Sequence, residues 1–444
     1  MRARLGKAQA LLRYSFWFVP ALMSLAAAAF SLLLTETTIG NRFPAIAWVD
    51  SLGSQGTRDL LVMIASSMIT VATTAFSIII VALQLASGQL GPRLLRNFIR
   101  DRANQTVLGT FLGTFVYSFL LIRRVDGANA GAAGDRIPDL AIVVAVILGL
   151  AAVAVLIFFI HHAALSVQKD RVIARVSQEL VGSLDKLYPK GIGTEPPYTE
   201  SGTAQRFPES AVTPWHDSFE LPLSGGGYIQ AVDAVKLMKV AIKNDLQIYL
   251  TKRPGDFVNH QAIVASARPS HRVTARHTHA LQDVFVLGSE RTAQQDVGFV
   301  FDQLVEIAIR ALSPGTTDSF TALRCIDRLA DALALVARTP FPSPYRFDSD
   351  GILRVITRPV SFDVLVSLVL YPVAEAAVGH TNVIVRLFET TREIGLACEQ
   401  KRERQALLRF NNYLLEAACT APGYLEHYAD LETLHQNARQ AIQT

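Results

Sequence analysis

The sequence predicts an α-helical membrane protein with four transmembrane helices, followed by a cytoplasmic α+β region with a small barrel-sandwich-like β module and an α-helical C-terminal domain. Four long stretches lack charged residues, the hydrophobic pattern changes to period two after Gly227, and helical periodicity returns from Val297. We expect a membrane domain (1–168), an amphipathic helix with a Pro-rich linker (169–222), the β module (223–287) and a mainly helical domain (288–444).

The composition excludes several classes of protein. Hydrophobic residues make up 50 % of the 444 positions and charged residues 18 %, against about 25 % charged residues in a soluble domain. Intrinsic disorder, a coiled coil and a nucleic-acid binder with a general basic excess are therefore excluded. Residues 1–165 hold 13 Lys and Arg against 7 Asp and Glu, so the positive net charge comes entirely from this hydrophobic part.

The four uncharged stretches are long enough to cross a bilayer, which takes roughly 20 helical residues. They cover residues 14–35, 60–92, 103–122 and 140–168. The first follows a basic start, but its apolar run is longer than that of a signal peptide, so we expect a retained helix. Lys and Arg are concentrated at alternate ends of the stretches, which predicts a bacterial inner-membrane protein with both termini in the cytoplasm.

The second stretch carries a polar stripe. At about 100° per residue, five polar residues fall within a sector about 60° wide. These pore-lining candidates are Ser66, Thr70, Thr73, Ser77 and Gln84. The stripe indicates either a water or ion path or helix packing, in which Ser and Thr bond a neighbouring helix or their own i−4 carbonyl. Gln84 is expected near the cytoplasmic end. Basic candidates at this inner mouth are Arg93, Arg96 and Arg100.

The third and fourth stretches offer weaker signals. Gly109 and Gly113 form a GxxxG motif, which suits contact between subunits or packing on the second helix of the same chain. His161 and His162 are expected at the lipid headgroups. No Asp, Glu, Lys or Arg lies inside the four stretches, which disfavours a proton-coupled or ion-coupled transporter.

The region after Gly227 predicts strands at 228–233, 246–250 and 262–265, with a helix at 234–243. A Pro-Gly-Asp turn at 254–256 resembles the barrel-sandwich domains that carry a cofactor on a lysine. Lys239 lies on the helical insert, so no cofactor is expected. A His-x-His pair at 277–279, if on a strand, suggests a metal site, but interleaved arginines favour a basic solvated surface, and no metal is expected.

Two helices are predicted at 297–312 and 320–337, and Asp318 or Ser319 caps the second. Their connecting turn is typical of a helix–turn–helix corner, although an anion site is an alternative. Asp350-Gly351 predicts a hairpin into 352–356, and residues 362–442 predict three or four helices. The three cysteines are widely spaced, which favours small buried side chains over a disulfide framework or a nucleophile.

Several strings resemble a bacterial family of predicted integral membrane proteins, domain of unknown function 2254. In the hydrophobic part they are SFWFVP (15–20), SMITV (67–71), FS (76–77), VALQLAS (81–87), GPRLLRNF (91–98), LGTFLGTFVY (108–117) and FIHH (159–162). Later in the chain they are RPGDFV (253–258), RT (291–292), QD (295–296) and ALSPG (311–315). The resemblance spans nearly the whole chain. It implies the same architecture and brings no activity.

The sequence contains no catalytic motif, so no catalytic residue is assigned and an enzyme is not expected. The leading interpretation is an oligomeric ion or small-solute channel that is lined by the second transmembrane helix and regulated by its cytoplasmic domain. The alternative is a non-conducting, membrane-anchored sensor or scaffold, and an enzyme with an unrecognised site is a third class. The expected partners are the lipid bilayer, further copies of the chain and an ion or small solute, without nucleic acid.

Overall fold

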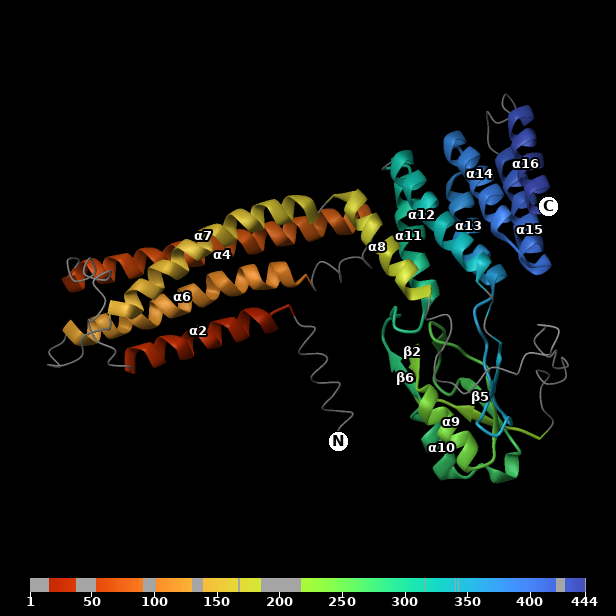
Figure 1. Ribbon diagram of the computed structural model, residues 1–444, viewed down its shortest axis with the longest axis horizontal. Helices are drawn as coiled ribbons and strands as arrows, with labels where there is room; N and C mark the ends of the chain where they lie inside the picture. Colours follow the sequence, from red (N-terminus) through yellow and green to blue (C-terminus); the bar gives the residue numbers. More distant parts are fainter. Residues whose placement is uncertain are drawn as a thin grey trace. The chain divides into compact units, whose positions relative to one another are not determined.

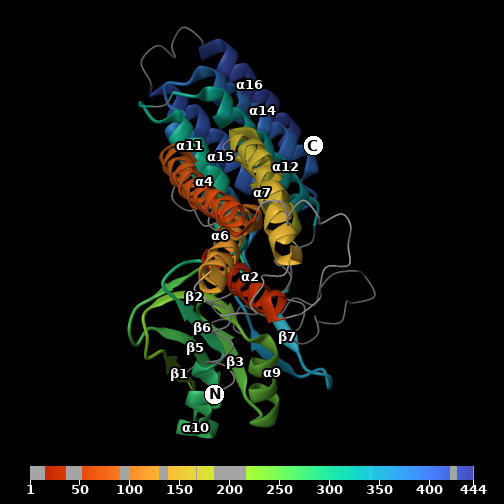
Figure 2. The same cartoon turned by 90° about the vertical axis from the view of Figure 1, so that its left-hand side faces the viewer.

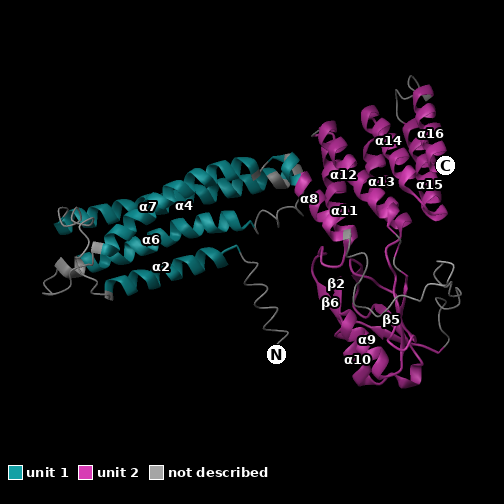
Figure 3. Cartoon of the chain, in the orientation of Figure 1, with its two compact units in different colours: residues 1–172 teal, residues 173–444 magenta. Residues whose placement is uncertain are grey.

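The computed structural model describes residues 16–36, 53–90, 101–129, 139–166, 168–184, 217–315, 317–339, 341, 343–420 and 428–443. The chain divides into two compact units, residues 1–172 and 173–444 (Figure 3). We call them the membrane unit and the C-terminal unit. Each unit has hydrophobic core clusters of its own.

The membrane unit contains the four predicted helices, α2 (Phe18–Glu36), α4 (Gly53–Leu90), α6 (Arg102–Asn129) and α7 (Asp139–Ser166) (Figure 1). Each holds a stretch long and apolar enough to span a membrane: Phe18–Thr35, Gly53–Leu85, Arg102–Val125 and Leu140–Leu165. The prediction of four such helices is confirmed. With 38 residues, α4 is about 57 Å long at 1.5 Å per residue and exceeds the roughly 30 Å hydrocarbon core.

Helix α6 is the centre of the membrane unit, because it packs against α2, α4 and α7. The GxxxG glycines of α6 face α2. A Cβ added to Gly109 would come within 2.5 Å of the Met23 sulfur, and one added to Gly113 would lie 3.5 Å from the Met23 carbonyl oxygen. The motif therefore serves close packing on the first helix, a contact that the sequence analysis did not consider.

The β region of the C-terminal unit forms two sheets. The five-stranded sheet has the order β1 (Phe219–Pro222), β5 (Ile263–Arg268), β3 (Gln247–Leu250), β8 (Leu353–Ile356), β7 (Tyr345–Phe347). The three-stranded sheet has the order β4 (Phe257–Val258), β2 (Gly227–Val232), β6 (Phe285–Gly288). Strands β3 and β8 pair in parallel, whereas the other pairs are antiparallel.

The barrel-sandwich detail of the predicted fold is not confirmed. The five-stranded sheet includes the hairpin of β7 and β8, whose register places Ile248 beside Val355. That hairpin comes from the region expected to be helical, and Gly351 makes its turn with φ +76°. The β region is thus a mixed pair of sheets completed by a distant segment of the chain.

Two helices cover the five-stranded sheet (Figure 2). Helix α9 (Ala234–Lys243) contacts β8, and α10 (Ala275–Gln282), which follows the 3₁₀ turn η5 (Ser270–Arg272), contacts β1. Leu237 and Ala241 of α9 and Leu281 of α10 are buried in the same core cluster as strand residues. The bounds of α9 agree with the prediction, because its apolar spacing and its N-cap, Asp233, are both local signals.

The remaining helices are α8 (Lys169–Leu184), α11 (Val297–Leu312), α12 (Ser319–Arg338), α13 (Phe362–Ala376), α14 (Thr381–Ala397), α15 (Lys401–Cys419) and α16 (Tyr428–Gln443). The hairpin into β8 and the helices after residue 361 follow the prediction. Asp318 caps α12: its carboxylate accepts from the Thr321 amide at 3.1 Å and the Thr321 hydroxyl at 2.7 Å. This carboxylate occupies the position where an external anion would bind.

Candidate functional site

The polar stripe of α4 faces away from the other described helices of the membrane unit. All five predicted residues are described, and all five side chains are exposed: Ser66, Thr70, Thr73, Ser77 and Gln84. The opposite side of α4 is buried against α6 and α7 through Met68, Ala72, Ala75 and Ile79. The stripe therefore does not mediate packing between the second and third helices.

Each hydroxyl group of the stripe donates a hydrogen bond to its own helix. Thr70, Thr73 and Ser77 donate to the carbonyl oxygens four residues earlier at 2.8, 2.9 and 2.9 Å. Ser66 donates to the carbonyl oxygen three residues earlier at 3.1 Å. Because a hydroxyl oxygen keeps its acceptor lone pairs after donating, the stripe presents acceptors and no free hydroxyl donor.

Further exposed polar residues flank the stripe, and the spacing of the stripe is more regular than the sequence analysis described. Ser67 and Thr74 are also exposed, and the Thr74 hydroxyl bonds the Thr70 carbonyl at 3.0 Å. Successive stripe positions are spaced by four, three and four residues, and the same alternation continues through Ile80 to Gln84. This is the heptad spacing of a helix seam, a signal that was already present in the sequence.

Gln84 lies at the end of the membrane unit where α6 begins and α7 ends. Its neighbour Leu83 packs with Phe16 and with Ala163 of α7 in one core cluster. The basic candidates of the inner mouth, Arg93, Arg96 and Arg100, lie outside the described residues.

A polar contact joins α6 and α7 at this same end. His162 Nε2 lies 2.9 Å from Asp101 Oδ2, and Asp101 Oδ1 accepts from the Ala103 amide at 2.9 Å. One carboxylate thus caps α6 and binds the last turns of α7. The sequence analysis placed His162 at the headgroups and did not predict this partner.

The cysteines and histidines form no reactive cluster among the described residues. Cys325 and Cys398 are buried, and burial raises the pKa of each thiol to about 12, which agrees with small apolar side chains. Cys419 is exposed, contrary to expectation. His277 and His279 lie on helix α10 rather than on a strand, and no group of three metal-binding side chains occurs in the part of the chain that the structure describes.

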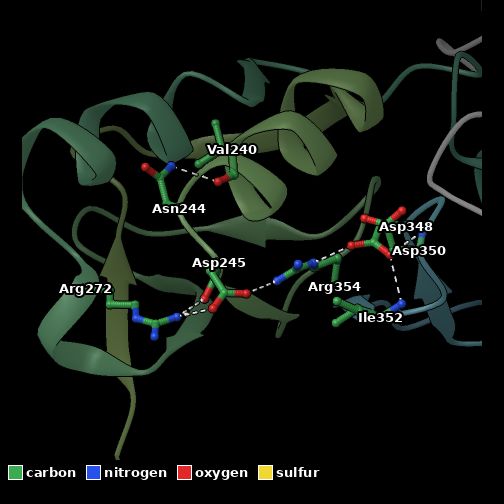
Figure 4. Close-up of polar contacts among 8 residues, drawn as sticks. All are labelled: Val240, Asn244, Asp245, Arg272, Asp348, Asp350, Ile352 and Arg354. Carbon is green, nitrogen blue, oxygen red and sulfur yellow. Dashed lines mark hydrogen bonds and ion pairs between the residues drawn. The ribbon is translucent and has the colours of Figure 1, made fainter.

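A chain of ion pairs links α9, the β7–β8 hairpin and η5 (Figure 4). Arg354 donates to Asp348 at 2.7 Å and to Asp245 at 2.6 Å, and Arg272 pairs with Asp245. Asp348 also accepts from the amides of Asp350 and Ile352, so its carboxylate closes the hairpin turn. Arg354 and Asp348 are buried. The network fixes the distant hairpin on the β region.

Acid should weaken this network. The Arg354 guanidinium holds the pKa of Asp245 and of Asp348 below their usual range. A depressed pKa contributes stability above the unfolded-state pKa of about 4, and this contribution is lost as the pH falls through the lower folded-state pKa. The urea concentration at the unfolding midpoint of the C-terminal unit should therefore decrease as the pH is lowered below about 4. In Arg354→Met this midpoint should decrease less steeply with pH. Equal pH dependence of variant and wild type would contradict this prediction.

A second cluster of ion pairs surrounds the start of α11, with Asp296 buried and Arg291 and Asp302 partly buried. Arg291 Nε and Nη2 donate to the two oxygens of Asp296 at 2.7 and 3.1 Å, and Arg291 also pairs with Asp302. Asp296 caps α11 by accepting from the Phe299 amide at 3.1 Å. Its side chain is only 7 % exposed. The cluster joins the β region to the helices through paired charges.

A model of the family described as predicted membrane protein, DUF2254, matches residues 13–393. The chain belongs to this family. It is 33 % identical over 320 residues to uncharacterised proteins of Mycobacterium bovis and Mycobacterium tuberculosis, which covers 69 % of this chain and 58 % of each relative. The chain thus matches less than two thirds of the length of these relatives. No solved structure matches this DUF2254 chain.

Three of the four DUF2254 strings of the C-terminal unit, RPGDFV, RT and QD, meet at the Arg291 cluster. Gly255, in the turn of the RPGDFV string, has φ +95°, and a Cβ added to it would lie 2.6 Å from the carboxyl carbon of Asp296. Gln295 holds β2 at both backbone groups of Val232, at 2.9 and 3.2 Å. Strings that are separated along the chain therefore contact one another at this cluster. These contacts give a structural reason for their residue types that does not require a catalytic role.

Gly255→Ala should destabilise the C-terminal unit of this DUF2254 protein by about 2–5 kcal/mol. Positive φ costs a residue with a Cβ about 1–2 kcal/mol, and overlap with the Asp296 carboxylate adds about 1–3 kcal/mol. Pulse proteolysis of full-length protein across urea concentrations measures the change. Gly379→Ala is the matched control, because Gly379 has φ +92° but no atom within 4 Å of the added Cβ. Equal losses for the two variants would exclude the contact with Asp296.

Proposed function

We propose that the chain is a membrane protein whose α4 stripes meet between copies and line a path for an ion or small solute. The observation that carries this proposal is the orientation of the stripe. Its polar side chains point away from the chain's own core. Polar side chains of membrane helices generally face a bundle interior or water rather than lipid. Further copies of the chain would supply such an interior.

The spacing of the stripe supports packing around an axis. Alternating intervals of four and three residues keep one seam of a helix facing its partners when the helices cross at about +20° in a left-handed bundle. Two copies would bring the small side chains into contact and close the seam. A larger ring would separate them and leave a path between. Such a ring has closed symmetry about an axis along the membrane normal.

The chemistry of the stripe favours cations or neutral solutes over anions. The hydroxyl donors are used within α4, so the hydroxyl groups of the stripe offer acceptor oxygens to a solute, and only Gln84 adds an amide that can both donate and accept. Acceptor oxygens replace part of the hydration shell of a cation. Uncharged ligands hold an ion weakly enough for release, which suits conduction more than ion-coupled transport.

Cross-linking tests whether the stripes meet. In a Cys419→Ser background, Ser77→Cys should form covalent dimers when membranes are treated with an oxidant or a bifunctional maleimide. Leu150→Cys on α7 is the matched control, because Leu150 is 67 % exposed but belongs to an apolar surface suited to lipid. Dimers at Leu150 and none at Ser77 would overturn the proposed arrangement.

Flux separates the two functional classes. Purified protein in liposomes should release K⁺ or a small neutral solute if the stripe conducts. Cross-linking at Ser77 without flux of any solute would favour the alternative, a non-conducting sensor or scaffold assembled through the same seam.

We also propose that both termini lie in the cytoplasm of a bacterial cell. Labelling of Ser54→Cys from outside intact cells should succeed, and failure would contradict this orientation.

A further inference from the structure

Helices α9 and α10 form the outer layer of the β region, side by side and antiparallel. Lys236, near the start of α9, pairs with Asp283, just after α10, at 3.2 Å. At the other end, Asp245, just after α9, pairs with Arg272, just before α10. Both helices bury their inner sides in one core. Their exposed sides therefore share one surface, which we call the α9–α10 face.

The exposed side of α9 combines apolar and basic residues. Val235 and Ile242 are 54 % and 44 % exposed, and Lys239 lies between them on the same side of the helix. Positions i, i+4 and i+7 fall within about 60° of one another at 100° per residue. Lys243 is also exposed beside them. Exposure of Val235 and Ile242 to water does not stabilise the fold, so their presence on this surface calls for another reason.

The α9–α10 face also carries cations that its acidic residues do not neutralise. Lys239, Lys243 and Arg276 are exposed and form no ion pair within the part of the chain that the structure describes. Asp283 is paired with Lys236 and Asp245 with two arginines, while Asp233 caps α9 by accepting from the Lys236 amide. Between their first and last residues, α9 and α10 contain no Asp or Glu.

We propose that the α9–α10 face docks on the anionic surface of a lipid bilayer. Amphipathic helices with Lys and Arg beside large apolar residues bind at the headgroup level, where apolar side chains enter the interface and cations meet anionic lipid. The chain carries four helices suited to span a membrane, so this face is tethered to a bilayer surface at high effective concentration. The inference rests on charge and apolar exposure and does not require that α4 conducts.

Full-length protein in lipid nanodiscs tests the docking. A polarity-sensitive fluorophore on Ala275→Cys, an exposed position of α10, reports the environment in a Cys419→Ser background. Its emission should shift to the blue in discs containing phosphatidylglycerol and not in discs of phosphatidylcholine alone. High salt should reverse the shift, because surface electrostatics are screened.

A charge-matched control identifies the residues. The triple variant Lys239→Glu, Lys243→Glu, Arg276→Glu should lose the shift. Arg328→Glu, Arg392→Glu, Lys401→Glu changes the charge equally at exposed positions of the helical region and should retain it. A shift retained by the first variant, or lost in both, would overturn the assignment. An equal shift in phosphatidylcholine discs after addition of a nucleic acid would replace lipid by a generic polyanion and also overturn it.

Discussion

Replacing Arg291 with methionine should lower the free energy of unfolding of the C-terminal unit by about 3–5 kcal/mol. Methionine keeps much of the side-chain volume but removes the charge that Asp296 and Asp302 share. Breaking a buried ion pair by removing one partner has a cost of this size, because the other charge is left buried without compensation. Proteolysis of full-length protein across a urea series would measure the loss.

Two further variants determine whether the loss comes from the buried charge. Arg310→Met should cost at most about 1 kcal/mol, because Arg310 pairs on the helix surface with Glu306 at 3.3 Å and exposed pairs contribute little. Adding Asp296→Asn to Arg291→Met should recover part of the stability, since asparagine caps a helix as well as aspartate does and carries no charge. A double variant less stable than the single one would contradict the charge argument.

Local signals made much of the fold predictable. The bounds of α9 and α11 agree with the residues expected, and Asp318 caps α12 as one of two candidates. A helix of this length is specified by apolar residues three and four apart and by a capping side chain next to it. The four membrane stretches were predictable for the same reason, because hydrophobicity over about 20 residues is a property of a short window.

Contacts between distant segments were not predictable. Arg354 reaches Asp245 across 109 positions of the chain, and β8 pairs in parallel with β3 after several intervening helices. The sequence analysis expected a separate β module because it read the 352–356 hairpin as part of the helical domain. The local residue pattern of a short strand does not indicate which other strand it pairs with. The family strings marked Gly255 and Arg291, but only the fold brings them to one carboxylate.

The stripe of α4 lies between these two cases. Angular spacing alone indicated a polar side, but it does not determine whether that side faces α6 or the exterior. The structure decides this through burial, since Ala72 and Ala75 face the core while Thr70 and Ser77 are exposed. What the stripe faces in an assembly depends on other copies and stays a prediction.

Ser77→Leu should cut flux through reconstituted protein by on the order of tenfold or more, since a barrier increase of only about 1.4 kcal/mol has that effect. A leucine at this level replaces an acceptor oxygen in every copy by an apolar group, which favours dewetting of the path. The folded chain should persist, because Ser77 is exposed and leucine is favourable in a membrane helix. Liposome flux measured at equal amounts of assembled protein gives the ratio.

Ser67→Leu is the matched control for this prediction. It makes the same substitution in the same exposed helix, but Ser67 lies about 80° around the helix from Ser77 at 100° per residue, at the flank of the seam. A path lined by the stripe therefore predicts a large loss for Ser77→Leu and a small one for Ser67→Leu. Equal losses would mean that added volume anywhere on this side disturbs assembly, as in a closed scaffold. Unchanged flux in Ser77→Leu would remove the stripe from the path altogether.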